Sequence, residues 1–150
     1  MGNCLKAFES QIDKKDRNMS TELGFQTKLH LPYDQVLSKT VDALKAEGFG
    51  ILTEIDVQTT FKQKLNVDFQ PYKILGACNP TLSHRALSSN VDVGLLLPCN
   101  VTVYQEGDDV VVTAIDPIIM LGELKDDPVV SGVAAEARAK LQRAIGSLAA

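Results

Sequence analysis

The 150-residue sequence predicts a single α+β domain in which an antiparallel or mixed sheet carries helices on one face. Three observations support this class. The length is that of one domain with a buried core. Five segments have strand character, and few of them are separated by a helix long enough for a parallel crossover. The C-terminal segment repeats apolar residues every three or four positions, as a helix packed against a sheet does.

The first third of the chain predicts a strand, a helix and a second strand. Apolar and polar residues alternate over 23–30, which predicts a strand that ends before Pro32. Residues 34–47 place apolar side chains on one helical stripe, and Gly48 is suited to the left-handed residue that follows a helix. A second strand is predicted over 50–57. Strict alternation would put the following residues on one of its faces: Ile51, Thr53, Ile55 and Val57.

The middle of the chain predicts two short helices around a third strand. Thr59 or Thr60 can cap the first of them. The strand is expected over 69–77. Asn79 then has the properties of an N-cap, and the proline after it suits the first position of a helix over 80–89.

The last third predicts a hairpin followed by a long helix. A long apolar strand is expected over 93–105 and another over 110–115, joined by a turn at 106–109. Asp127 and Pro128 have the properties of an N-cap and the first residue of the final helix. The buried stripe of that helix is predicted to contain Val130, Val133, Ala134, Ala137, Leu141, Ile145 and Leu148.

Composition excludes several functional classes. The apolar fraction is 45% and the charged fraction 23%, as in soluble globular proteins. A net charge of −4 and the lack of tryptophan argue against a nucleic-acid-binding protein. The sequence contains no apolar run of the ~20 residues that a membrane span needs and no secretory signal, so a soluble, cytoplasmic protein is expected. It also contains no phosphate-binding loop and neither the GxSxG nor the HExxH motif. No cofactor is therefore evident, and the sequence does not favour an enzyme.

The three cysteines do not form a recognisable framework. Cys4, Cys78 and Cys99 are odd in number, and none belongs to a CxxC pair. His30 and His84 do not stand at metal-ligand spacing from them. We therefore expect reduced thiols, with no metal site.

Residues 1–20 differ from the rest and are treated as an N-terminal extension, flexible or in a short helix, with the domain over 21–150. The extension opens with Met-Gly-Asn-Cys. Gly2 and Cys4 would anchor the chain to a membrane if both were lipidated. The usual motif has serine or threonine where this chain has Lys6, so an unstructured tail is the simpler interpretation.

Four segments carry a resemblance to a known family: ALKAEGFGILTEIDV (43–57), YKILGACNP (72–80), GLLLPCNVTV (94–103) and the Asp-Pro pair at 116–117. Together, and in this order, they resemble the DUF302 family over residues 22–148. The resemblance implies a TT1751-like fold, close to the TBP-like class, and a homodimer. It implies no activity, because the family has no established function.

The candidate site is the pair of Cys-Asn segments, LGACNP (75–80) and LLLPCN (95–100). Cys78 would precede a helix N-terminus, where the backbone N–H groups favour a thiolate. Cys99 shares a predicted strand face with apolar residues and reads as a packed side chain. Whether the two thiols meet is left open by the sequence.

Four further residues complete the candidate pocket: Gly76, Asn79, Asn100 and His84. Glycine permits close approach of a ligand or backbone, and histidine beside a thiol can act as a base. A solvent-exposed histidine is the simpler interpretation. The leading hypothesis is a module that binds an unidentified small molecule or regulates another process. The alternatives are a redox protein that uses Cys78, with or without Cys99, and a structural or interaction domain without a small-molecule site.

Overall fold

The computed structural model describes residues 20–149 and confirms the α+β class. Within that range one antiparallel sheet has five strands in the order β1-β5-β4-β3-β2. The strands are β1 (Gly24–Leu29), β2 (Gly50–Asp56), β3 (Tyr72–Cys78), β4 (Cys99–Glu106) and β5 (Asp109–Ile115). Of the predicted extension over 1–20 only Ser20 is described, and it forms an isolated antiparallel bridge with Phe25; Gly2 and Cys4 lie outside the described residues.

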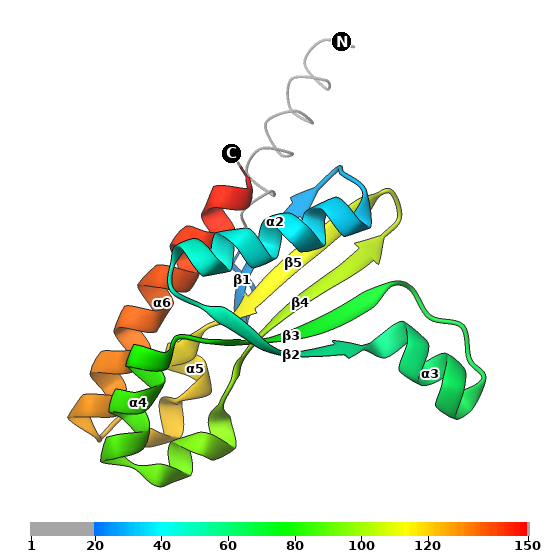
Figure 1. The fold of residues 1–150 in the computed structure, drawn as a ribbon. Coiled ribbons are helices and arrows are strands. Elements are labelled where there is room, and N and C mark those ends of the chain that lie inside the picture. The colour runs from blue at the N-terminus through cyan, green and yellow to red at the C-terminus, as the bar shows by residue number, and fades with distance from the viewer. Residues whose placement is uncertain (1–19, 150) are drawn as a thin grey trace.

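The helices pack mainly on one face of this sheet (Figure 1). They are α2 (Tyr33–Ala46), α3 (Val57–Leu65), α4 (Pro80–Ser89), α5 (Pro117–Met120) and α6 (Pro128–Leu148). Two 3₁₀ helices are η1 (Val91–Leu96) and η2 (Gly122–Leu124). Helices α2 and α6 lie side by side across the sheet, and α4 packs against α6 at one end of it.

The core lies between the sheet and helices α2 and α6. All seven residues of the stripe predicted for α6 are buried, which confirms the sequence pattern of that helix. Asp127 caps it, and its carboxylate accepts hydrogen bonds from the backbone N–H groups of Val129 and Val130. Opposite this stripe, alternate residues of the central strands point inward: Val101 and Val103 on β4, and Val110, Val112 and Ala114 on β5.

The other face of the sheet has no helix across it in the described part of the chain (Figure 1). Side chains at the alternate strand positions point to this side. Tyr72 of β3 is the register partner of Tyr104 of β4, and their two rings stack with centroids 5.2 Å apart, a spacing typical of aromatic pairs. We call this side the open face.

The predicted strand 93–105 is wrong in its first half. Residues 91–96 form η1, capped by the Asn90 side chain, and β4 begins only at Cys99. Pro98 has no N–H group to donate to a sheet ladder, which agrees with a strand that begins after it. Leu95 is 85% exposed and so does not share an inward face with Cys99.

Three other predictions need correction. The carboxylate of Asp56 caps α3 by accepting from the N–H of Thr59, so neither Thr59 nor Thr60 is the cap. Strand β2 has a bulge between Ile51 and Thr53, which breaks the expected alternation, and Val57 belongs to α3. The short helices α5 and η2 were not anticipated.

The remaining boundaries follow the sequence closely. Strand β3 begins at Tyr72, three residues later than expected, while Gly48 has the predicted positive φ, at 85°. The turn of the β4–β5 hairpin lies where it was expected, and Gly107 has a φ of 59°. Over residues 20–149 we find no helix that is both long and apolar enough to cross a bilayer.

Candidate functional site

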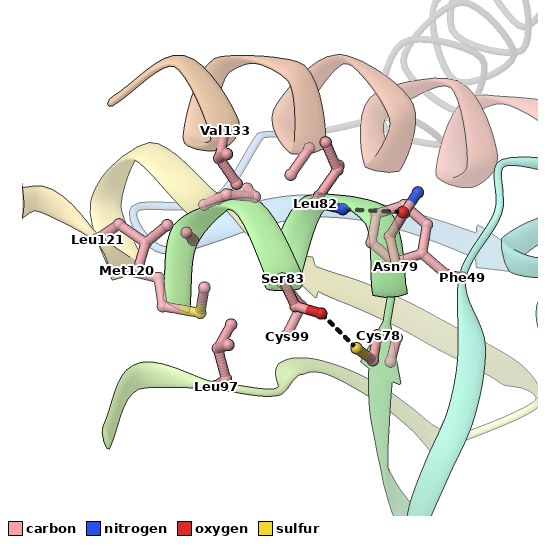
Figure 2. Close-up of a pocket in the computed structure, with 14 residues that line it drawn as sticks. Phe49, Cys78, Asn79, Leu82, Ser83, Leu97, Cys99, Met120, Leu121 and Val133 are labelled. Carbon is pink, nitrogen blue, oxygen red and sulfur yellow. Dashed lines mark hydrogen bonds between the residues drawn. The ribbon is translucent and has the colours of Figure 1, made fainter. Parts of the chain in front are cut away.

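The two Cys-Asn segments meet because β3 and β4 are neighbouring antiparallel strands. Ala77 of β3 is the register partner of Cys99 of β4, so Cys78 stands at the end of one strand and Cys99 at the start of the next. Between them the chain leaves the sheet through α4 and η1 and returns to it. A cavity lies under this excursion, with Cys78 and Cys99 both in its wall (Figure 2).

The start of α4 is fixed by Asn79, as the sequence predicted. Its Oδ1 atom accepts a hydrogen bond from the N–H of Leu82 at 3.3 Å. Its Nδ2 atom donates to the carbonyl oxygen of Glu47 at 3.4 Å, which ties α4 to the end of α2. A side chain at Gly48 would crowd the Asn79 amide, at 2.9 Å from its nitrogen. Asn79 therefore positions the helix that roofs the cavity.

The cavity is small and lined almost entirely by apolar side chains. The space open to the centre of a water-sized sphere is about 30 Å³, enough for one or two groups the size of water. The floor is made by the strand ends and the walls by α4, α5 and α6. The lining residues are Phe49, Ala77, Cys78, Asn79, Leu82, Ser83, Ala86, Leu97, Cys99, Pro117, Met120, Leu121, Val133 and Ala137.

Cys99 is a buried thiol. Only 6% of Cys99 is exposed to solvent. Burial raises the pKa of its thiol to about 11, and the nearby thiol of Cys78 makes a smaller contribution in the same direction. Because the thiolate is the reactive form, Cys99 stays protonated and slow to react at neutral pH. The expectation that Cys99 is a packed side chain agrees with this burial.

Cys78 is half-buried at the edge of the same cavity. Its Sγ atom lies 3.3 Å from the Oγ atom of Ser83 (Figure 2). The Ser83 hydroxyl donates its one proton to the carbonyl oxygen of Pro80 at 3.2 Å. The Cys78 thiol is then the donor to Ser83, since a hydroxyl has a single hydrogen to give. Cys78 and Ser83 are thus the polar edge of an apolar cavity.

The other predicted residues lie elsewhere. Gly76 and Asn100 are register partners, and by strand alternation they belong to the open face, whereas the cavity lies on the helix side. His84 is exposed on α4 beside Arg85 and does not line the cavity. Within residues 20–149 no group of three His, Cys, Asp or Glu side chains is arranged to hold a metal ion. Of the six predicted residues, the structure brings together Cys78, Asn79 and Cys99.

Sequence reasoning missed the wall that α5 provides. Met120 and Leu121 come from this short helix and its end, and both line the cavity. The signal was the Asp116-Pro117 pair, because Asp116 caps α5 by accepting from the N–H of Ile118 at 2.9 Å. Chemically, the site offers an apolar space with two thiols, the thioether of Met120 and the hydroxyl of Ser83 at its wall. None of its lining side chains is a carboxylate, a histidine or a cation.

Gly76 is required by close packing on the open face. A Cβ atom at this position would collide with the Oγ1 atom of Thr53 and lie 2.8 Å from the Cγ atom of Pro98. We predict that Gly76→Ala lowers the free energy of unfolding by about 1–3 kcal/mol. Gly50→Ala is the matched control on the next strand, because no atom lies within 4 Å of its Cβ position. Urea unfolding measures both; equal small effects would show that the contact at Gly76 is not restrictive.

The two described cysteines should react at different rates in the folded protein. We predict that iodoacetamide modifies Cys78 well before Cys99, because Cys99 is buried and its pKa is about 11. Peptide mass spectrometry distinguishes these residues from Cys4. In urea the two rates should become equal, which controls for local sequence. Equal rates in the folded protein would contradict the burial of Cys99.

Comparison with known proteins identifies the family. The family model described as "Domain of unknown function DUF302" matches residues 25–148. The chain is also similar to a crystal structure of an uncharacterised conserved DUF302 protein from Bacillus stearothermophilus, with 28% identity and a TM-score of 0.76. That match covers 84% of this chain and 98% of the other. A search of curated proteins finds no match. The resemblance noted in the sequence is confirmed, and the chain belongs to the DUF302 family.

Proposed function

We propose that this DUF302 protein is a binding module for a small, largely apolar molecule, held in the cavity between α4, α6 and the ends of β3 and β4. The supporting observation is the cavity itself, an apolar space with one polar edge. Small-molecule sites commonly combine apolar walls with a few placed polar groups. Cys78 and Ser83 would supply those groups, and the apolar walls would exclude charged ligands.

The size of the cavity limits what the closed form can hold. A space of about 30 Å³ admits a methyl-sized or thiol-sized group, so a larger molecule would enter only as the wall moves. Leu97 and Met120 are the half-buried side chains of that wall, and methionine adapts readily to a new shape. The proposed ligand is therefore short, with an apolar body and a polar end at Cys78 and Ser83.

Binding of this kind suits a regulatory role. A ligand held in the cavity would touch α4, α5 and α6 at once and would stabilise their packing against the strand ends. The stabilisation would grow with the ratio of free ligand to its dissociation constant. We place the module in the cytoplasm, where both thiols stay reduced.

Xenon and 1-butanol test the proposal. Xenon occupies dry apolar cavities, and 1-butanol adds a polar end to a short apolar chain. We predict saturable shifts in methyl NMR spectra that are largest for Leu82, Leu97, Met120 and Val133, all of which line the cavity. Methyl groups of the sheet core, such as those of Val110, should not shift.

A matched pair of variants makes this test specific. Ala77 and Ala114 are both fully buried strand residues, but only Ala77 lines the cavity. Ala77→Val should abolish the shifts, while Ala114→Val should leave them unchanged. Shifts that are absent in the wild-type protein, or equal in both variants, would contradict a ligand site here and favour a domain without a small-molecule site.

The second candidate is a thiol-dependent redox protein, favoured by one observation: Cys78 and Cys99 line the same cavity. Forming a disulfide would remove two electrons and two protons from these thiols. An external disulfide would accept these electrons and protons and be reduced to two thiols. The raised pKa of Cys99 argues against rapid exchange. The alkylation experiment therefore also separates the two candidates, since fast alkylation of Cys99 would favour redox chemistry.

A further inference from the structure

The cavity has its thiol and hydroxyl edge at one end and its most accessible apolar side chains at the other. Figure 2 shows Cys78 and Ser83 together on one side, and Leu97 and Met120 on the opposite side. Leu97 and Met120 are half-buried, whereas the other apolar side chains of the lining are buried. A ligand whose polar end lies at Cys78 and Ser83 therefore directs its apolar body toward Leu97 and Met120.

Exposed apolar side chains stand next to these two residues along the chain. Leu97 is two positions after Leu95, which is more exposed than any other large apolar side chain in the described residues. Met120 directly follows Ile118 and Ile119, and both are about half exposed. Because Leu97 and Met120 line one cavity, the two segments meet there. We call Leu95, Ile118 and Ile119 the apolar rim.

The rim continues the wall of the cavity without an intervening polar group. The segments 95–97 and 118–120 consist of apolar residues only. A single exposed leucine needs no explanation, but exposed apolar side chains that adjoin an apolar cavity are typical of a ligand-binding groove. Met120 can turn aside at little cost, since its side chain is unbranched. An apolar path then leads from Cys78 through the cavity to the surface.

We propose that the ligand is an unbranched alkyl chain with a polar end, which passes between Leu97 and Met120 and ends on the apolar rim. This inference rests on the proposed function, because it uses the same cavity and the same polar edge, and it adds the chemical class of the ligand. Each methylene group that leaves water at the rim would strengthen binding. A branched molecule of equal size would also have to displace the buried walls, which close packing opposes.

A series of linear alcohols tests this class of ligand. We would titrate 1-butanol, 1-hexanol and 1-octanol into the full chain and follow methyl NMR spectra. The dissociation constant should fall about threefold for each added methylene group. The matched control ligand is 2-ethyl-1-hexanol, which has as many carbon atoms as 1-octanol and should bind about tenfold more weakly. Methyl groups of the apolar rim should shift with 1-octanol and not with 1-butanol.

Variants of the rim test where the far end of the chain lies. Leu95→Ser, and the double variant of Ile118→Ser with Ile119→Ser, should each weaken 1-octanol binding about threefold to tenfold and leave 1-butanol binding unchanged. The controls are Leu65→Ser on α3 and Ile55→Ser on β2, at side chains 65% and 49% exposed, away from the strand ends that form the cavity. Neither control should change the binding of either alcohol. Circular dichroism confirms that every variant is folded.

The outcomes separate this inference from the proposed function. If 1-butanol does not bind in the cavity, the proposed function fails and the inference fails with it. If 1-butanol binds but affinity does not rise with chain length, the cavity remains a ligand site and the linear-chain ligand is overturned. Equal affinities for 1-octanol and 2-ethyl-1-hexanol, or 1-octanol binding that the rim variants do not weaken, would overturn the linear-chain ligand as well.

Discussion

The antiparallel pairing of β3 with β4 is the constraint on which the candidate site depends. Its register sets Ala77 opposite Cys99 and so brings two segments together that are twenty residues apart along the chain. Because side chains alternate along a strand, the same register turns Cys99 toward the helices and Asn100 toward the open face. The excursion through α4 and η1 then has to cover the strand ends, and the cavity is the space that this cover leaves.

The two faces of the sheet carry different properties. The helix side holds the core and an apolar cavity with one buried thiol, Cys99, and one half-buried thiol, Cys78, and this suits the recognition of a small apolar group. The open face holds stacked tyrosines, and α3, which has no fully buried side chain, extends from the same sheet. Gly76 links the two, since it belongs to the strand that forms the cavity floor while its missing side chain makes room for Thr53 and Pro98 on the open face.

Much of this fold could be predicted from the sequence, because its strongest signals are local. The caps at Asn79 and Asp127, the turn at Gly107 and the apolar stripe of α6 each act within a few residues of themselves. The predictions that were wrong concern segments whose local pattern is compatible with two kinds of secondary structure. The residues 93–96 suit a strand or a helical turn equally, and in the fold they belong to η1.

The site was predicted only in part for a related reason. Cys78 and Asn79 could be placed because the Asn79-Pro80 pair predicts the start of a helix. The contribution of Met120 and Leu121 depends on packing between distant segments. Asn100 and His84 were included for their residue types and their sequence neighbours. Strand alternation in one case and an exposed helix position in the other direct them away from the cavity.

The register of β3 on β4 can be measured directly by nuclear Overhauser effects between backbone protons. The structure predicts cross-strand contacts from Ala77 to Cys99 and from Leu75 to Val101. Contacts from Cys78 to Cys99 in place of the first pair would mean a register shifted by one residue. Such a shift would turn the Cys99 side chain to the other face of the sheet and contradict the shared cavity.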